Sequence, residues 1–307
     1  MKKIYFLAVV AFTTVLLILF VFYNRYRVYY EDEKIDFYIS KNIDILNDNL
    51  NFEKQYALSL SFFISQNQMI KQALYVNDQN LALKEVNKFL KEIKHSTGID
   101  NIDIQVHTKN LEAFARNWDK SDYLGLKLSG FRKGLVEVKK SKKSLVSIEL
   151  GKRLNIKAIS PILDENQEFI GSIEIIMNFQ NIKKRLQKFD LEMLPLLDEK
   201  FIDIAVYLKN NQKIDKYYIT ENEYSKEFYE KLKTHKYVFN RDKFYYEIDD
   251  KIIVFVPMLS VGIQDIGFIA LCMDAKQNKI NTYSSVDVEQ ENSNYEFNQM
   301  KRKVIIK

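Results

Sequence analysis

Cysteine, histidine, proline and glycine are scarce in this chain, and two of these scarcities exclude classes of site. The one cysteine, Cys272, cannot form an intramolecular disulfide and lies in an apolar run, where a small core residue is expected. The three histidines, His95, His107 and His235, are far apart and have no second ligand at metal-binding spacing. The sequence therefore predicts no metal site and no cofactor.

Enzyme motifs are missing as well. The sequence contains no nucleophile elbow, no glycine-rich phosphate loop and no Walker pattern. The acidic pair Asp249-Asp250 lies in a predicted turn and is typical of turns. We therefore expect a protein without enzymatic activity and without catalytic residues.

The charge pattern argues against nucleic acid as a partner. The 46 basic and 41 acidic residues are interleaved along the whole chain, and no basic stripe with spaced aromatic residues occurs. With 47% hydrophobic residues in 307, the chain can bury a sizeable core and has the length of about two domains.

One long apolar run is present, at the N-terminus. Ile4–Tyr23 carries no charged residue and is flanked by basic residues on both sides. As a helix it would span roughly 30 Å, the thickness of the bilayer core. A cleaved signal peptide is the alternative, but no small-residue cleavage site follows the run. We expect residues 1–28 to be a single-pass anchor in the inner (cytoplasmic) membrane, with the rest of the chain in the periplasm.

A helical stalk is expected next, over residues 29–94. Tyr29–Val76 contains neither proline nor glycine, and apolar residues recur every three or four positions, which predicts one continuous helix roughly 70 Å long. A second amphipathic stretch follows and ends at Gly98. Two roles stay open for the long helix: a buried packing spine, or a surface that pairs with a second copy to form a homodimer.

The clearest internal pattern is a repeat. Ile159–Lys183 recurs without a gap as Phe255–Lys279, so that Pro161 aligns with Pro257 and Gly171 with Gly267. Each copy has an apolar strand, a polar turn and a second apolar strand with a glycine near its start, which predicts an antiparallel hairpin with a bulge or close backbone approach at the glycine. We infer two copies of one module in an α+β fold.

Each hairpin follows a predicted set of strands and one helix. In the first module the strands are Asn101–His107, Leu111–Trp118 and Leu145–Leu150, and the helix is Phe131–Lys140. In the second module the strands are Phe201–Leu208, Tyr237–Phe239 and Phe244–Ile248, and the helix is Glu221–Thr234.

Three stretches of the first module resemble a known family. FARNW (Phe114–Trp118), SGFRKGLVEVKKSKKSLVSIELGK (Ser129–Lys152) and IKAISPILDENQEFIGSIEI (Ile156–Ile175) are similar to the distal half of double Cache domains, the extracytoplasmic ligand-binding regions of bacterial chemoreceptors, sensor kinases and diguanylate cyclases. The resemblance covers roughly Tyr29–Lys279. It implies two tandem PAS-like modules with antiparallel sheets, a membrane-distal one at 95–190 and a membrane-proximal one at 191–280.

The resemblance also implies a role. Such a domain binds a small molecule in its distal module and takes part in signal transduction of the chemotaxis or two-component type. A second transmembrane helix and an output domain would follow, whereas residues 281–307 are polar and expected to be disordered, so we expect a truncated or split receptor. The alternative is a membrane-anchored structural or interaction protein without a ligand. Leu126 and the lysines at 152 and 157 depart from the family pattern, which has an acidic residue and arginines there.

Six residues of the first module are candidates for ligand binding. Arg116 and Trp118 share one strand face and Arg132 lies on the next helix, an arrangement suited to a small carboxylate or other anionic metabolite. Tyr123 would cover the pocket. Core packing for Trp118 and a surface salt bridge for Arg132 are the alternatives.

Glu149 and Lys157 complete the set. Glu149 and Glu174 lie among apolar strand residues, and a buried carboxylate requires a cationic partner such as Arg116, Arg132 or Lys157. A structural ion pair is the favoured interpretation of these acids. In the second module, four strand tyrosines are predicted to belong to an ordinary core rather than to a second pocket: Tyr217, Tyr218, Tyr245 and Tyr246.

Overall fold

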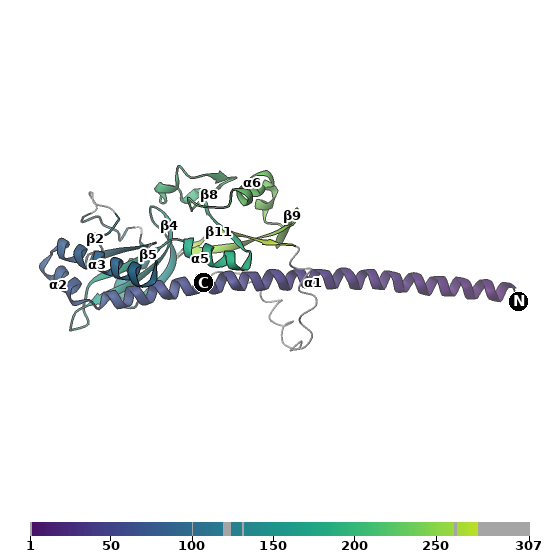
Figure 1. Cartoon of the computed structure of the whole chain (residues 1–307), viewed down its shortest axis with the longest axis horizontal. Helices are drawn as coiled ribbons and strands as arrows, with labels where there is room; N and C mark the ends of the chain where they lie inside the picture. The colour runs from purple at the N-terminus through teal and green to yellow at the C-terminus, as the bar shows by residue number, and fades with distance from the viewer. Residues whose placement is uncertain (1, 100, 119–123, 131, 261–262, 276–307) are drawn as a thin grey trace.

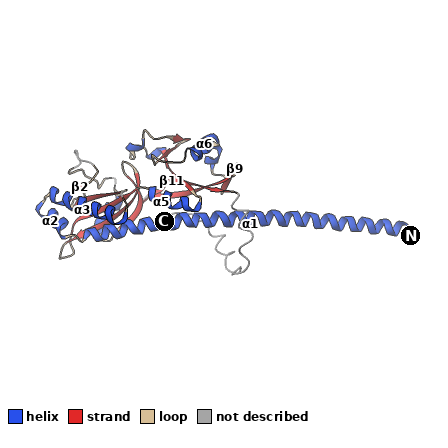
Figure 2. Ribbon diagram, viewed as in Figure 1, coloured by secondary structure: helices blue, strands red, loops and turns tan. Residues whose placement is uncertain are grey.

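A single long helix and two antiparallel sheets form the molecule. The computed structural model describes residues 2–99, 101–118, 124–130, 132–260 and 263–275. Helix α1 (Lys2–Ser65) runs along the whole length, and both sheets lie against its C-terminal half (Figure 1). The mixture of helices with antiparallel strands, which Figure 2 shows by colour, confirms the α+β class.

The first sheet has five strands within the described residues, in the order β2-β1-β5-β4-β3. Its strands are β1 (Ile102–Thr108), β2 (Ala113–Arg116), β3 (Leu145–Leu150), β4 (Leu154–Leu163) and β5 (Phe169–Met177). Helix α4 (Lys133–Ser141) lies between β2 and β3 in the chain, so the predicted succession of two strands, a helix and three strands is confirmed.

The second sheet has six strands in the described part of the chain, in the order β7-β8-β6-β11-β10-β9. Its strands are β6 (Glu192–Asp198), β7 (Lys213–Ile214), β8 (Tyr217–Ile219), β9 (Tyr245–Ile248), β10 (Lys251–Ser260) and β11 (Ile263–Asp274). Helix α5 (Gln180–Leu186) connects the two sheets, and α6 (Lys226–Thr234) starts at the Ser225 cap, later than predicted.

Two strands predicted in the second module are wrong. Residues 201–208 and 237–239 belong to turns of 3-10 helix at Glu199–Phe201, Val206–Leu208 and Lys236–Asn240. The Asp198 side chain accepts a hydrogen bond from the Lys200 N–H and so starts the first of these turns. Ala205 and Leu208, three positions apart, are both buried, which is helical rather than strand spacing.

The repeated segments form two hairpins with the same register. Pro161 pairs with Ser172 in β4–β5, and Pro257 pairs with Phe268 at the aligned positions of β10–β11. A Cβ atom on Gly171 or Gly267 would collide with a carbonyl oxygen of the neighbouring strand, and Gly267 also has a φ of 146°. The close backbone approach predicted at both glycines is therefore confirmed.

The continuous helix predicted to Val76 is interrupted. α1 ends at Ser65, and the Asn67 side chain accepts a hydrogen bond from the Ile70 N–H, which caps a new helix, α2 (Gln68–Val76). Asp78 caps α3 (Gln79–Thr97), which ends at Gly98 as predicted. Cap formation by one asparagine thus ends α1, although the apolar pattern continues beyond Ser65.

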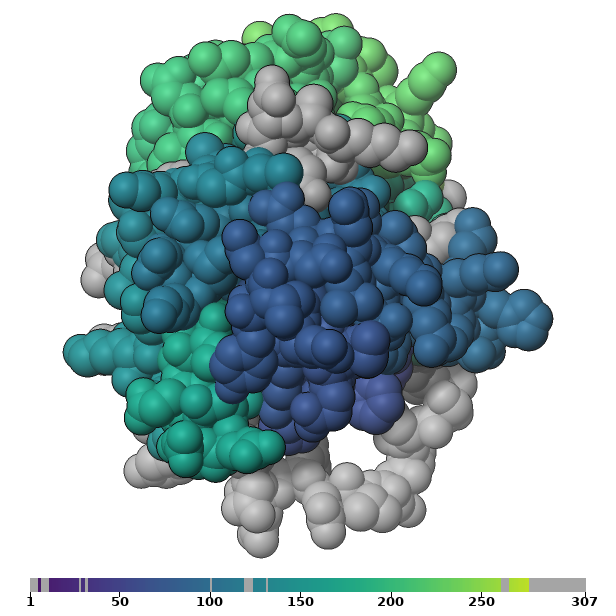
Figure 3. Space-filling model, turned by 90° about the vertical axis from the view of Figure 1, so that its left-hand side faces the viewer, coloured from purple at the N-terminus to yellow at the C-terminus, as the bar shows by residue number. Residues whose placement is uncertain are grey.

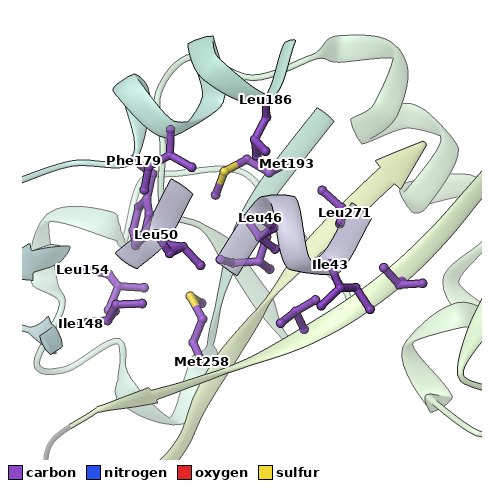
Figure 4. Packing of buried hydrophobic residues seen from close by; sticks show 14 of the residues in the cluster. Ile43, Leu46, Leu50, Ile148, Leu154, Phe179, Leu186, Met193, Met258 and Leu271 are labelled. Atoms are coloured by element: carbon purple, nitrogen blue, oxygen red, sulfur yellow. The ribbon is translucent and has the colours of Figure 1, made fainter. Parts of the chain in front are cut away.

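The face of α1 toward the sheets is buried over its C-terminal half. Ile43, Leu46 and Leu50 pack in one cluster with residues of both sheets, among them Leu154 and Leu271 (Figure 4). Further along α1, Ala57 and Ile64 pack on the first sheet alone. The second sheet therefore lies nearer to the N-terminus of α1 than the first sheet does (Figure 1).

Glu53 interrupts the apolar stripe of α1 without interrupting its burial. Its carboxylate, 1% exposed, accepts hydrogen bonds from Arg185 at 2.6 Å and from Asn181 at 2.9 Å, both on α5.

The last described strand also returns to α1, because the Tyr38 hydroxyl donates to the Asp274 carbonyl oxygen at 3.1 Å.

The end of the molecule farthest from the start of α1 is formed by the first module. Figure 3 looks at this end and shows the side chains of the α2 and α3 region at its centre. At the opposite end, large apolar side chains of α1 such as Phe12, Leu17 and Phe20 are exposed. A search of the described residues finds no helix with a stretch apolar and long enough to cross a bilayer.

Candidate functional site

The face of the first sheet that points away from α1 carries a hollow of about 550 Å³. Strands β1, β2, β4 and β5 supply its floor, the segment before α4 supplies one side, and Tyr207 of the second module supplies the outer wall. Its lining residues are Asp103, Gln105, Arg116, Trp118, Leu126, Leu128, Arg132, Gly151, Lys152, Arg153, Asn155, Lys157, Ile176 and Tyr207.

Arg132 lies at the start of α4 and is held by two buried carboxylates. Its guanidinium is bonded to both oxygens of Glu174 on β5 and lies 3.4 Å from Glu149 on β3. All three side chains are buried, and Gly134 leaves room for the Glu149 carboxylate, because a Cβ there would overlap it. Burial alone would raise the pKa of the Glu174 carboxyl, but Arg132 outweighs it and the pKa is lowered well below its ordinary value.

His107 extends this cluster beneath the floor. Its Nδ1 lies 3.0 Å from the Ser172 hydroxyl, and its Nε2 lies 3.6 Å from the Glu174 carboxylate. Burial lowers the pKa of the imidazole, and Glu174 opposes that shift. The ring is fully buried and is not among the described residues that line the hollow.

Lys157 on β4 is a buried cation of the floor. Its ammonium donates to the Leu150 carbonyl oxygen at 3.3 Å, and Gly151 makes room for it, since a Cβ at Gly151 would lie 2.6 Å from Nζ. Burial, together with the nearby Arg132, lowers the pKa of Lys157 to about 8. The neighbouring strands thus accommodate an ammonium at a cost in its hydration.

Cations outnumber carboxylates around the hollow. Among its described lining residues, one side chain is acidic, Asp103, whose carboxylate accepts a hydrogen bond from Asn117 at 2.9 Å. The cationic side chains are Arg116, Arg132, Lys152, Arg153 and Lys157. The Arg116 guanidinium carbon lies 5.4 Å from the centre of the Trp118 ring, so an aromatic surface and a cation adjoin. The strand predicted over Leu111–Trp118 is shorter, however, because β2 ends at Arg116 and Trp118 lies beyond it.

The structure brings four of the six candidate residues together. Arg116, Trp118, Arg132 and Lys157 line the same hollow. Glu149 lies behind Arg132 and does not line it, which agrees with the ion pair favoured for this acid and is inconsistent with a surface salt bridge for Arg132. Tyr123 lies outside the described residues.

Sequence reasoning missed the outer wall of the site. Lys152 was noted only as a departure from the family pattern, and Arg153 was missed. The Lys-Arg pair directly after Gly151, which follows β3, was an available signal. Tyr207 had no such signal, because its place depends on how the second module packs against the first. It also lines a second, smaller hollow of about 170 Å³ between the modules, next to Asn178, Thr220 and Glu221.

The second module has an aromatic interior at the corresponding place. Tyr217 and Phe268 lie 4.4 Å apart between ring centres, and Phe255 lies 4.9 Å from Phe268. Tyr217 and Tyr246 are buried in this cluster, which confirms the predicted core role for these two tyrosines. No group of three or more His, Cys, Asp or Glu side chains that could hold a metal ion occurs among the residues described.

Comparison with protein families gives one match. The family model named dCache_3, described as a double sensory domain of two-component sensor kinase, matches residues 38–274. No curated protein matches the chain.

Several solved structures are similar to this chain at low sequence identity. The sensor domain of the Vibrio cholerae histidine kinase DctB is 12% identical, with 78% of this chain and 97% of that chain covered and a TM-score of 0.48. The ligand-binding domain of the Pseudomonas fluorescens chemoreceptor CtaA, solved with L-leucine, is 13% identical, with 80% and 97% covered and a TM-score of 0.44. That of the Campylobacter jejuni chemoreceptor Tlp3, solved with L-valine, is 12% identical, with 81% and 97% covered and a TM-score of 0.43.

Proposed function

The chain belongs to the dCache_3 family of double sensory domains, and from this premise we propose that its first module binds a small anionic molecule in the hollow beside Arg116. The site would serve signal transduction of the chemotaxis or two-component type, in the periplasm. The observation that carries this proposal is the charge of the hollow, where five cationic side chains face one carboxylate among the described lining residues.

The dimensions of the hollow support a metabolite as its occupant. Ligand pockets commonly enclose about 300–1,000 Å³ and combine apolar walls with a few polar groups. This hollow has about 550 Å³, with Leu126, Leu128 and Ile176 beside the cations. A carboxylate, phosphate or sulfonate of a few carbon atoms fits such a space and such a charge.

The cations have different parts in this proposal. Arg132 is held by Glu149 and Glu174, so it shapes the wall and adds little net charge. Arg116 lines the hollow and lies against the Trp118 ring, and its planar guanidinium can form two parallel hydrogen bonds with an anion, so we assign the main contact with the ligand to Arg116. Burial lowers the pKa of Lys157 to about 8, and an anion bound beside its ammonium would stabilise the charged form again.

A thermal-shift panel tests the site. The full chain, purified in a nonionic detergent, is heated with carboxylates, amino acids, phosphates and sulfonates at fixed ionic strength. A ligand at a hundredfold excess over its dissociation constant stabilises the protein by about 2.7 kcal/mol, which is a readily measured rise in melting temperature.

Two arginine variants make the test specific. Arg116→Gln should abolish the rise, whereas Arg241→Gln removes an arginine that lies 5.0 Å from the Phe268 ring in the second module and should keep it. An undiminished rise in Arg116→Gln would place the ligand elsewhere. A folded protein that responds to no anion would favour the alternative, a structural or interaction protein.

Membrane anchoring is the second part of the proposal. The support is the uncharged run Ile4–Tyr23 and the exposure of the described side chains of α1 at residues 11–23. Bilayer insertion would remove these side chains from water and place the first module farther from the membrane than the second.

Carbonate extraction of membranes tests the anchor. We expect the wild-type chain to stay in the pellet. Phe12→Lys with Leu16→Lys should release it, because each lysine costs about 3 kcal/mol in the middle of a membrane helix. Wild-type protein in the supernatant would refute the anchor.

Pairing of two copies through α1 is the third part. Phe37, Phe52, Phe62 and Phe63 are all more than half exposed. Their positions fall within a sector of about 100° on an α-helix. We expect Phe37→Cys, in a Cys272→Ala background, to form a disulfide-linked dimer under mild oxidation, and Glu165→Cys, in the exposed turn between β4 and β5, to form less of it. Equal yields from the two variants would argue against this face.

A further inference from the structure

The outer wall of the hollow belongs to the second module. Tyr207 lies in the turn Val206–Leu208, and its neighbours Ala205 and Leu208 are buried in the cluster that joins both sheets to α1. The buried side chains of Ala205 and Leu208 hold the turn in place, while the Tyr207 side chain is half exposed and lines the hollow. The position of Tyr207 therefore depends on how the second module packs against the first.

Tyr207 contacts both cations at the mouth of the hollow. Its backbone N–H donates to the Lys152 carbonyl oxygen at 3.0 Å, and the Lys152 ammonium donates to its hydroxyl at 3.2 Å. The same ring centre lies 5.0 Å from the Lys152 ammonium and 5.8 Å from the Arg153 guanidinium carbon. Such cation–π contacts orient the two cations toward the ring.

The hydroxyl of Tyr207 is equipped to bind an anion. A phenol oxygen that accepts a hydrogen bond from an ammonium still has its own proton to donate. Hydrogen bonds in which one partner is charged are the stronger ones, and the donor here lies beside Lys152 and lines the same hollow as Arg116.

We propose that Tyr207 is a ligand-binding residue, supplied by the second module to the site in the first. The inference rests on the function proposed above and adds a residue and a consequence to it. An anion held by Arg116 and Lys152 then touches both modules at once. Its binding energy depends on how the modules are placed relative to each other, so occupancy favours one placement over others.

The one tryptophan of the sequence provides the readout. Trp118 lines the same hollow as Tyr207, so its fluorescence reports on the site without a known ligand. The probes are iodide, caesium and acrylamide, which are anionic, cationic and neutral quenchers. All measurements use the full chain in nonionic detergent at constant ionic strength.

Three variants are compared with wild type. Tyr207→Phe keeps the wall but removes the hydroxyl, so we expect iodide quenching to fall by a factor of about two while acrylamide quenching stays the same. Tyr207→Ala removes the wall and should raise acrylamide quenching. Tyr218→Ala is the matched control, because Tyr218 also has a lysine beside its ring, Lys213 at 5.6 Å, but lies on β8 outside the hollow.

The outcomes separate this inference from the function on which it rests. Each quenching constant is divided by that of N-acetyltryptophanamide in the same buffer, because iodide quenches free indole more efficiently than caesium does. A larger ratio for iodide than for caesium in wild type supports the anion site itself, and the reverse order overturns the proposed function. With the iodide preference present, quenching constants of both Tyr207 variants equal to those of Tyr218→Ala overturn the role of Tyr207 alone.

Discussion

The two modules share a hairpin with the same register, yet they bury opposite kinds of side chain on the face that points away from α1. Lys157, Ser172 and Glu174 of the first module align in the repeat with Ile253, Phe268 and Ala270 of the second. The first set belongs to a buried network of charges around the hollow, and the second belongs to an apolar core. One backbone thus supports either a polar site or a packed interior.

The two interiors also differ in how much their buried side chains stabilise the fold. Buried ions lose hydration and are stable only when partners restore the lost interactions, whereas apolar and aromatic side chains are stabilised by burial itself. A module that keeps ions in its interior gives up stability that its duplicate retains. This contrast is what we expect when one copy has a site to maintain and the other maintains the fold.

The largest effect on stability is expected from placing a carboxylate in the apolar interior of the second module. Ala270→Glu puts a carboxylate at the position aligned with Glu174, among apolar neighbours such as Phe268 and Ile253. We expect a loss on the order of 5 kcal/mol, measured as the urea midpoint by circular dichroism. Ala270→Val adds volume without charge and should cost less. Equal losses in the two variants would mean that volume, not charge, limits this site.

The next largest effect is expected from breaking the charge network. Glu174→Ala leaves the buried Arg132 with Glu149 as its remaining carboxylate and should cost about 3–5 kcal/mol in urea unfolding. Glu168→Ala removes an exposed acid paired with Lys142 and should cost less than about 1 kcal/mol. The contrast between buried and exposed pairs fails if the two losses are similar.

The paired glycines compare the modules directly. Gly267→Ala introduces a side chain at a φ of 146° and against the Leu196 carbonyl, whereas Gly171→Ala is crowded by His107 and Leu74 without an unusual φ. We expect a loss of about 1–3 kcal/mol from the conformational strain at Gly267 beyond the loss at Gly171. Thermal unfolding of both variants measures the difference, and a greater loss at Gly171 would contradict it.

The smallest effect is a pH dependence confined to the first module. Because its pKa is lowered to about 8, Lys157 releases its proton in the folded state at a pH where the unfolded chain still holds it. Stability should therefore rise by about 1 kcal/mol between pH 7 and pH 9 in wild type relative to Lys157→Ile, which carries the residue of the second module. Parallel stability curves for the two proteins would refute the buried charge.

Much of the fold was predictable because it depends on local patterns. The repeat around Pro161 and Pro257, its glycines and the end of α3 at Gly98 are all confirmed. The break after Ser65 was missed because one hydrogen bond, donated by the Ile70 N–H to the Asn67 side chain, decides it within an apolar pattern that continues. The strand predicted at 201–208 was wrong because apolar residues alone do not distinguish a strand from successive tight turns.

The site was predictable to the extent that it lies on neighbouring strands. The period of a strand predicted Arg116 beside Trp118, and both line the hollow although β2 ends at Arg116. Arg132 and Lys157 were found as charges among apolar residues. Tyr207 comes from a part of the chain that no pattern connects to these residues. Only the packing of one module on the other brings it to the hollow.

The contact of the Tyr38 hydroxyl with the Asp274 carbonyl oxygen places the entrance to the folded body and the last described strand side by side. This contact joins the N-terminal part of the folded body on α1 directly to the end of β11. A change in the shape of the first module would reach the Tyr38–Asp274 contact by two routes, α1 and the second sheet. The contact would therefore respond to a displacement of α1 relative to the second sheet, which neither element could report alone.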